Sequence, residues 1–317
     1  MKFSSLFITC FFGAAQLSAQ SPAKIHTEDV CNFWIAYDSV QSTQIKEKQV
    51  QFLQTLYVDK ASQGLKDFIA ARGFNAEEWL KDINVAPKFW KSVRTKTLAV
   101  IDQRDEINNL MLRFGQLYPA FRQPEIYFAV GCLRTAGTTS PGRILIGIEM
   151  AAPDSTVDAS ELSDWHRGRF RDNSGIIPLL AHEAVHTQQK AESDTLFLLG
   201  KCLREGASDF IAKLLFEGRV YSTPYLTYGK GNEKTIFLKF KEDMYQTESN
   251  KWLYNGSNAP KGQADLGYFV GFAICQYYYD NAPNKAEAVA KILTIDYQDN
   301  NAVNLFYEKT KYADKMN

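Results

Sequence analysis

The stretch Ser174-Gly-Ile-Ile-Pro-Leu-Leu-Ala-His-Glu-Ala-Val-His-Thr-Gln-Gln189 carries two histidines four residues apart, with a glutamate directly after the first. On an α-helix, residues i and i+4 lie one above the other, so His182 and His186 present both imidazoles to one metal ion. Glu183 is rotated by about 100° around the helix axis, which places its carboxylate beside the metal. The pattern predicts a zinc-activated water with Glu183 as its general base.

A competing interpretation is a buried helix with two hydrogen-bonded histidines and no metal. The spacing of the histidines alone does not exclude it, because this pattern arises by chance in about one of a hundred chains of this length. A helix itself is strongly indicated, since Ile177, Leu180 and Ala184 fall on the side away from the histidines and form an apolar face. The metal interpretation therefore requires a third ligand elsewhere in the chain.

The N-terminus has the composition of a signal peptide. A short basic end precedes an apolar run that is too short to span a bilayer, and Leu17-Ser18-Ala19 offers the small residues that signal peptidase requires. We expect residues 1–19 to be removed and the mature chain to be exported, to the periplasm or beyond the cell. Cys10 lacks the preceding small residues of a lipoprotein signal, so we expect no lipid anchor.

The overall composition excludes several classes of protein. The chain has 36 basic and 36 acidic residues, so neither nucleic acid nor an anionic membrane surface is an expected partner. No apolar run after the signal peptide is long enough for a transmembrane segment. An exported compartment permits disulfides, but sequence does not choose among the three pairings of Cys31, Cys132, Cys202 and Cys275.

The pattern of apolar residues predicts an α+β fold that is mostly helical. Residues 20–123 read as an N-terminal helical lobe, with a capping box at Asn75-Ala-Glu-Glu78 and one long helix from Pro87 to just before Pro119. Residues 124–317 read as a zincin-like catalytic region, which can also form one compact domain with the helical lobe.

Two β-rich runs open this second region. Residues 125–131 and 143–150 are predicted strands, and residues 132–142 between them read as a Gly/Thr loop. A strand along a metal site can hold a peptide by backbone pairing, but a small sheet that only covers the helix is an equal alternative. Residues 151–173 read as a surface loop in which His166 is solvated.

The third metal ligand is His26, His166 or a carboxylate, because the chain contains only four histidines. Glu205 and Asp209 are the strongest candidates, since they lie at i and i+4 on a helix whose apolar stripe uses other positions. Two carboxylates at this spacing repel each other, which is unusual on a purely structural helix. The pair is explained if the two residues have different roles. Glu205 is expected to bind zinc, and Asp209 to accept the free N–H of a ligating histidine, His182.

The two motifs together resemble the gluzincin pattern of the thermolysin-like metallopeptidases. In that pattern the later glutamate is the third zinc ligand and the aspartate orients a histidine, which implies the same roles for Glu205 and Asp209. The segments Glu205-Gly-Ala-Ser-Asp-Phe-Ile-Ala, Leu266-Gly-Tyr-Phe-Val-Gly271 and Ser62-x-Gly-Leu-x-x-Phe68 are similar to a bacterial family of predicted Zn-dependent proteases. That family, a domain of unknown function related to the gliding-motility lipoproteins of Bacteroidetes, covers nearly the whole mature chain.

The C-terminal third is predicted to be helical, with one helix from about Ala264 to Tyr279 and one or two more between Lys285 and Lys315. Tyr268 lies in the first of these helices. Zinc peptidases commonly place a phenol or imidazole donor where the oxyanion develops, and Tyr268 is our candidate for that donor. A core aromatic residue is the alternative.

These features predict an exported zinc metallopeptidase that hydrolyses a peptide or protein substrate. His182, His186 and Glu205 bind Zn²⁺, and Glu183 takes a proton from the water and returns it to the leaving amine. The main alternative is a non-catalytic zinc-binding envelope protein that supports a gliding or secretion assembly. A third possibility is a zinc hydrolase that acts on amides or cell-wall peptides.

Overall fold

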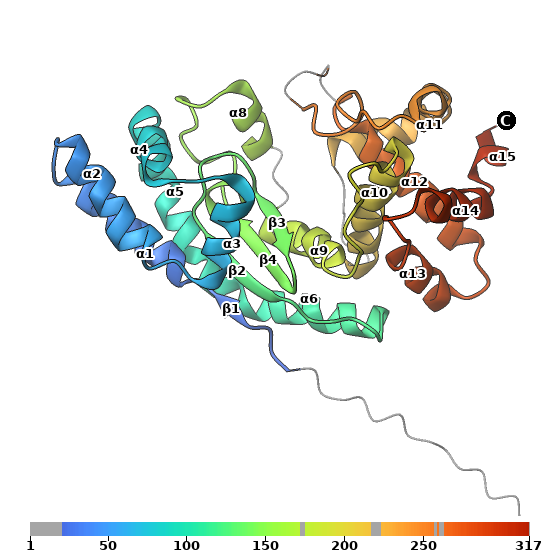
Figure 1. Cartoon of the computed structure of the whole chain (residues 1–317), viewed down its shortest axis with the longest axis horizontal. Helices are drawn as coiled ribbons and strands as arrows, with labels where there is room; N and C mark the ends of the chain where they lie inside the picture. Colours follow the sequence, from blue (N-terminus) through green and yellow to red (C-terminus); the bar gives the residue numbers. More distant parts are fainter. Residues whose placement is uncertain (1–20, 172–174, 217–222, 257–258, 260–262, 317) are drawn as a thin grey trace, which may run out of the picture.

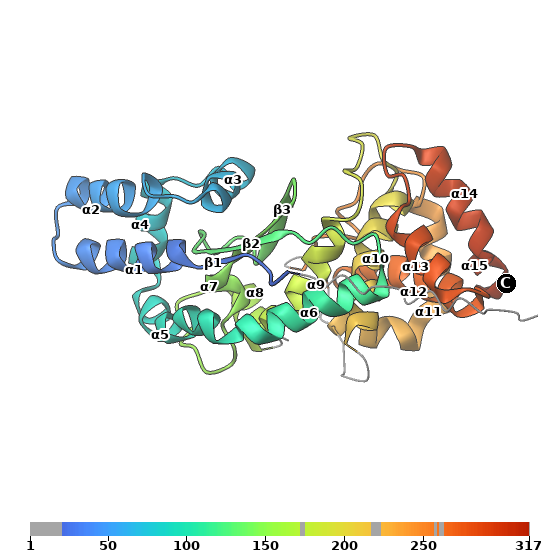
Figure 2. The same ribbon diagram turned by 90° about the horizontal axis from the view of Figure 1, so that it is seen from below.

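The structure of the chain, a computed structural model, describes residues 21–171, 175–216, 223–256, 259 and 263–316. Helices dominate it, with one small sheet, so the predicted mostly helical α+β class is confirmed. Figures 1 and 2 show the sheet and α9 in the middle, with the N-terminal helices at one end and the C-terminal helices at the other. The predicted signal peptide with Cys10, and the last residue of the sequence, lie outside the described residues.

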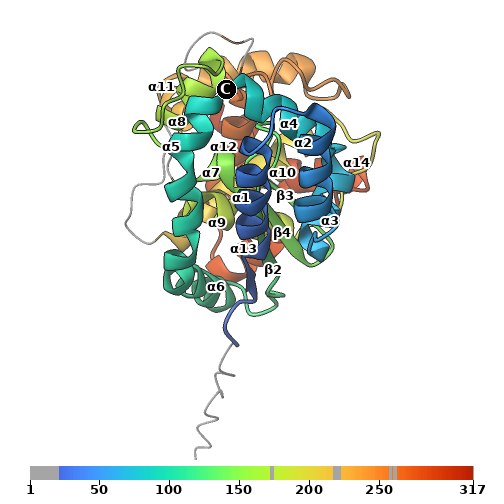
Figure 3. The same cartoon turned by 90° about the vertical axis from the view of Figure 1, so that its left-hand side faces the viewer.

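The N-terminal helices bury their aromatic and aliphatic positions against each other and against the sheet. Figure 3 shows α1 with α5 and α6 on one side and α2, α3 and α4 on the other. Asn75 caps α4 by accepting the N–H of Glu78, as the capping box predicts. The helices are α1 (Glu28–Gln41), α2 (Lys46–Leu53), α3 (Gln63–Arg72), α4 (Ala76–Val85), α5 (Pro87–Leu98) and α6 (Arg104–Leu117).

The single long helix expected after Pro87 is wrong. A 3₁₀ segment, Ala99–Gln103, separates α5 from α6, although α6 does end before Pro119 as predicted. The apolar periodicity continues through this segment because Val100 remains buried within it. Periodicity alone therefore did not reveal the break.

The sheet has four strands in the order β1-β2-β4-β3, from β1 (Ile25–His26), β2 (Glu125–Ala129), β3 (Gly137–Ser140) and β4 (Arg143–Gly147). The two predicted strands are β2 and β4, and they run parallel to each other. The predicted loop between them contains β3, which pairs antiparallel with β4 and forms the edge. Its residues, Gly-Thr-Thr-Ser, are all half-buried and have no apolar alternation, so no periodic pattern marked this strand.

The segment 151–173, predicted to be a surface loop, contains a helix, α8 (Asp164–Arg171). His166 within it is not simply solvated, because its Nε2 lies 2.9 Å from the Leu133 carbonyl and its Nδ1 lies 2.7 Å from Ser163 Oγ. Phe170 of the same helix is buried and stacks on Phe89. α8 is therefore fixed to α5 and to the loop that leads into β3.

A buried carboxylate holds that loop in place. Glu149, on the short helix α7 (Ile148–Ala151) after β4, is fully buried and accepts the backbone N–H groups of Gly131 and Leu133. Burial raises the pKa of Glu149 to about 7, while the two N–H groups oppose this rise. The loop that leads into β3 is thus held by a carboxylate, that of Glu149, which is not one of the predicted metal ligands.

The C-terminal half is built on a close pair of helices, α10 and α12. Gly206 of α10 meets the backbone of α12, because a Cβ at Gly206 would lie 2.1 Å from the Phe272 nitrogen and 2.5 Å from Gly271 Cα. The remaining helices pack around this pair. The helices of this half are α9 (Ile176–His186), α10 (Leu198–Leu215), α11 (Pro224–Asp243), α12 (Leu266–Asn281), α13 (Lys285–Leu293), α14 (Asn300–Thr310) and α15 (Tyr312–Met316).

The four cysteines of the described chain are not paired with one another. Cys31 is exposed and Cys132, Cys202 and Cys275 are buried, and all four are free thiols. Within the described residues, no helix is both long enough and apolar enough to cross a membrane. The division into lobes at residue 123 stays a prediction.

We predict that Gly206→Ala lowers the free energy of unfolding by about 3 kcal/mol, because the added methyl group meets backbone atoms that cannot move independently. Gly231→Ala on α11 is the matched control, since a Cβ there has no neighbour within 4 Å. Its expected effect is within about 1 kcal/mol of zero and favourable in sign. Chemical denaturation of both variants measures the difference; equal stabilities would contradict the close packing.

Candidate metal centre

Three side chains from two helices converge on one point. His182 and His186 lie on α9, and Glu205 lies on α10. The two Nε2 atoms are 3.0 Å apart, and Glu205 Oε2 lies 3.3 Å from His182 Nε2 and 3.2 Å from His186 Nε2. Among the described residues, these three are the group of His, Cys, Asp and Glu side chains that could hold a metal ion.

The partners of the other ring nitrogens define the tautomers of both histidines. Asp209 Oδ1 lies 2.8 Å from His182 Nδ1, and a carboxylate only accepts, so this nitrogen carries the proton. Gln189 Oε1 lies 2.8 Å from His186 Nδ1. The Gln189 amide is oriented with its oxygen toward the ring because its nitrogen donates to the Arg204 carbonyl. Both Nε2 atoms of the neutral rings therefore present lone pairs.

The donor set fits a zinc ion. Two Nε2 lone pairs and one carboxylate oxygen face each other within about 3 Å, an arrangement that is repulsive unless a cation or protons lie between them. Tetrahedral zinc with ligand bonds of about 2.0–2.1 Å holds its ligand atoms about 3.3 Å apart. The observed separations match this value, and the hydrogen bond from each Nδ1 is the usual support of a ligating histidine.

Electrostatics at the centre favour positive charge. Burial lowers the pKa of His182, but Asp209 and Glu205 outweigh it and hold this pKa well above its ordinary value. Burial raises the pKa of Glu205, but His186 and His182 outweigh it and hold this pKa well below its ordinary value. A buried carboxylate that stays ionised beside two histidines is suited to bind a cation.

Glu183 lies next to the centre and against the sheet. Its side chain is buried, and a Cβ at Gly137 would lie 2.5 Å from Glu183 Oε1. Gly137 is the first residue of the edge strand β3, so only a residue without a side chain lets this strand approach the carboxylate. Burial raises the pKa of Glu183, while His186 and His182 oppose that rise.

Three tyrosines, Tyr225, Tyr254 and Tyr268, lie next to the metal ligands and Asp209. Tyr225 donates to Asp209 Oδ2 at 2.7 Å, and Tyr254 donates to Glu205 Oε1 at 2.9 Å, so each supports a carboxylate of the centre. The Tyr268 ring packs between them, 5.3 Å from the Tyr225 ring and 6.1 Å from the Tyr254 ring. It also lies 6.3 Å from the His182 ring.

The structure brings together all the site residues that the sequence singled out: His182, Glu183, His186, Glu205, Asp209 and Tyr268. His26 and His166, the other candidates for a third ligand, are engaged elsewhere, His26 by stacking on Tyr127. Sequence reasoning missed Gln189, Tyr225, Tyr254 and Gly137. Of these four residues, Gln189 is the one that the sequence could have revealed, because it lies three residues after His186 and side chains at this spacing can meet.

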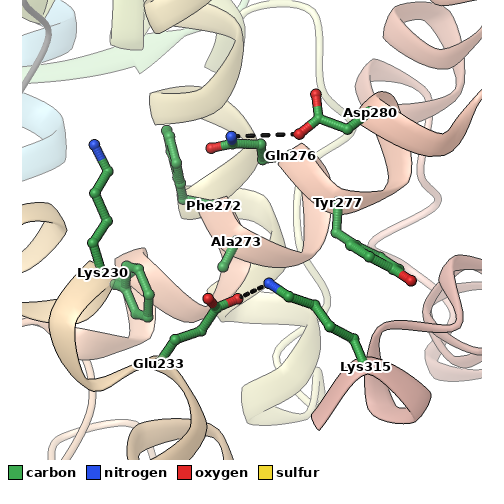
Figure 4. Close-up of a pocket in the computed structure, with 9 residues that line it drawn as sticks. Lys230, Glu233, Phe272, Ala273, Gln276, Tyr277, Asp280 and Lys315 are labelled. Atoms are coloured by element: carbon green, nitrogen blue, oxygen red, sulfur yellow. Dashed lines mark hydrogen bonds and ion pairs between the residues drawn. The ribbon is translucent and has the colours of Figure 1, made fainter.

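A separate cavity of about 250 Å³ lies between α11, α12 and α15 (Figure 4). Its lining includes Lys230, Phe272 and Tyr277, and none of the residues of the metal centre. Glu233 in its wall is neutralised by Lys315. The cavity is therefore distinct from the centre and has no strong net charge of its own.

Comparison with known proteins places this chain in a family. The family model described as gliding motility protein GldB matches residues 18–312, which is nearly the whole chain. The chain belongs to this family. Neither a curated protein nor a solved structure matches the chain. The expected relation to gliding-motility proteins is thus confirmed, while the zinc-protease assignment remains a prediction for this GldB-family chain.

We predict that Glu205→Ala abolishes zinc binding by this GldB-family chain and that Asp209→Asn weakens it by about tenfold to a hundredfold. Loss of a ligand removes a bond to the metal, whereas loss of the aspartate charge only weakens the support of His182. Asp280→Asn, an identical change on the far part of α12, is the control and should bind as the wild type does. Competition with a chromogenic chelator gives the dissociation constants; an unchanged zinc content in Glu205→Ala would require another ligand.

Proposed function

We propose that this GldB-family protein is a zinc-dependent metallopeptidase with a zincin-like core. The observation that carries the proposal is the meeting of His182 Nε2, His186 Nε2 and Glu205 Oε2, with a fourth group, the carboxylate of Glu183, near them. Two histidines and one carboxylate are a ligand set of catalytic zinc, which keeps one coordination position for water or substrate.

Glu183 performs the proton transfers in this proposal. When bound, zinc supplies Lewis acidity toward water and toward a carbonyl oxygen. Glu183 accepts the proton of the attacking water and returns it to the leaving amine, so one carboxylate serves both steps. Its buried position against Gly137 supports this role, because a raised pKa makes the carboxylate a stronger base.

The edge strand β3 is the element best placed to hold the substrate. β3 pairs with β4 on one side only and begins at Gly137, in contact with Glu183. An extended peptide can add to such an edge through backbone hydrogen bonds. This geometry favours a peptide bond over a smaller amide as the target, because pairing requires several residues on each substrate.

The family name supports a place in the cell envelope, and the predicted signal peptide, residues 1–19, supports export. We propose a location in the cell envelope or outside the cell, and peptide or protein substrates met there.

A second candidate function is a non-catalytic zinc-binding role in a gliding or secretion assembly. The family description favours it, since it names motility and no reaction. The two candidates differ at the open coordination position, because a structural zinc site is closed by a fourth protein ligand. Spectroscopy of a cobalt-substituted sample distinguishes them, through its response to added small anions.

We predict that Glu183→Gln abolishes peptide hydrolysis while zinc stays bound. The amide keeps the shape of the side chain but cannot accept the proton of the water. Glu242→Gln, on the exposed side of α11, is the matched control and should keep full activity. A peptide library incubated with and without a chelator gives the substrates and the rates. Hydrolysis by Glu183→Gln at the wild-type rate would remove Glu183 from the mechanism.

We further predict different effects for two of the tyrosines. Tyr268→Phe should lower kcat by about a hundredfold with little change in zinc affinity, because it removes the donor to the developing oxyanion. Tyr254→Phe should weaken zinc binding by several-fold, because Tyr254 supports the Glu205 carboxylate. Steady-state kinetics and metal titration of both variants separate the roles. If Tyr268→Phe retained full kcat, Tyr268 would be a packing residue.

A further inference from the structure

The helix α8, which the sequence did not predict, places one arginine at the metal centre. Trp165 of α8 touches the wall that carries Tyr254 and Asp265, because a methyl group at Gly256 would lie 3.1 Å from Trp165 Nε1 and 3.6 Å from Asp265 Oδ2. Arg169 lies four residues after Trp165, one helical turn along the same face. Arg169 therefore lies on the side of α8 that faces this wall, whereas the Phe170 side packs on α5.

The groups around Arg169 are those of the centre. Desolvation by the surrounding protein lowers the pKa of Arg169, and the nearby ionisable groups Tyr225, Tyr268, Asp265 and Glu183 oppose this fall. The guanidinium thus lies within electrostatic range of the proposed general base and of two of the tyrosines that line the site. It keeps its charge, since arginine is not deprotonated in proteins.

Arg169 nevertheless has no ion pair or hydrogen bond to any residue in the part of the chain that the structure describes, and the side chain is open to solvent. Arg167, one residue before Gly168 on the same helix, behaves differently and pairs with Asp164. Arg204, the other arginine near the centre, lies 3.6 Å from Glu205 Oε1 and is only 18% exposed. Among the described residues near the centre, Arg169 is therefore a solvent-accessible cation whose N–H groups have no partner in the protein.

We propose that Arg169 binds a carboxylate of the substrate and so determines which peptides this site accepts; this inference rests on the proposed peptidase function. A peptide carboxylate that enters here meets the negative charges of Glu183 and Asp265, which oppose its binding. The fork of Arg169 compensates for them with two parallel N–H donors. The carboxylate is either the C-terminus of the peptide or an acidic side chain near the scissile bond.

Matched peptides distinguish the two sources. The first pair is a cleaved library peptide with a free C-terminal carboxylate and the same peptide as its amide. The second pair is an amidated peptide with glutamate near the scissile bond and the same peptide with glutamine. For each pair, kcat/KM is measured with the wild type, Arg169→Met, Arg169→Lys and a control, Lys91→Met, which removes one positive charge from an exposed position on α5.

We expect the wild type to prefer the carboxylate member of one pair by about thirtyfold, the effect of a charge-assisted hydrogen bond. The preference should fall to less than about threefold in Arg169→Met, be intermediate in Arg169→Lys and persist in Lys91→Met. The pair that shows it identifies the source: a preference in the first pair means action near the C-terminus, and one in the second means selection of acidic side chains. Equal rates within both pairs, or a preference that survives in Arg169→Met, would overturn the inference.

Binding gives a second measurement that does not need turnover. The dissociation constants of the same peptides are measured by calorimetry with the Glu183→Gln variant, with and without the Arg169→Met change. Tighter binding of the carboxylate peptide, lost with Arg169→Met, supports the inference even where the wild type cleaves neither peptide, an outcome that would refute only the peptidase function. Cleavage without any difference between carboxylate and neutral peptides would refute only the role of Arg169.

Discussion

The mutual repulsion of three buried acceptors is the constraint on which the centre depends. His182 Nε2, His186 Nε2 and Glu205 Oε2 face each other at about 3 Å, so only a cation or added protons between them relieve the repulsion. The surrounding groups maintain this arrangement, since Asp209 and Gln189 hold the Nδ1 protons on the far side of each ring. Such an arrangement is costly without a cation and stable with one.

The rigidity of this cluster comes from the helices that carry it. α10 supplies Glu205 and Asp209, and Gly206 between them brings α10 into backbone contact with α12. Residues 205–209 of α10 thus contain both carboxylates of the centre and the glycine that packs on α12. A larger residue at position 206 would move α10 away from α12 and, with it, the two carboxylates relative to α9. Position 206 therefore links the stability of the C-terminal half to the geometry of the centre.

The parts of the site that could be predicted from sequence are those set by local helical spacing. His182 and His186 at i and i+4, and Glu205 and Asp209 at i and i+4, each report their own geometry, so the two pairs were recognisable without a structure. Residues brought in by tertiary packing had no such signal. Tyr254 has a left-handed backbone, φ +58°, in a segment without periodicity, and Tyr225 opens a helix whose apolar face points elsewhere.

The same distinction explains the errors in the fold. β3 has four small or polar residues, and its pairing is fixed by the turn at Gly142, φ +72°, and by the partner strand β4. α8 is rich in arginine and has one buried residue, Phe170, so its sequence resembles a solvated loop. Both elements are held by partners distant in sequence, which no local pattern records.

These two unpredicted elements both come near Glu183. β3 approaches Glu183 through Gly137, and α8 places Arg169 within electrostatic range of the same carboxylate. The residues that would bind a metal are thus encoded by helical periodicity, whereas the surfaces that would contact a substrate are assembled from segments with weak sequence signals. This difference explains why the proposed zinc chemistry could be predicted from the sequence, whereas the substrate could not. An unpaired arginine among carboxylates is the feature that most restricts which substrate fits, because it favours the one kind of group that the rest of the site would repel.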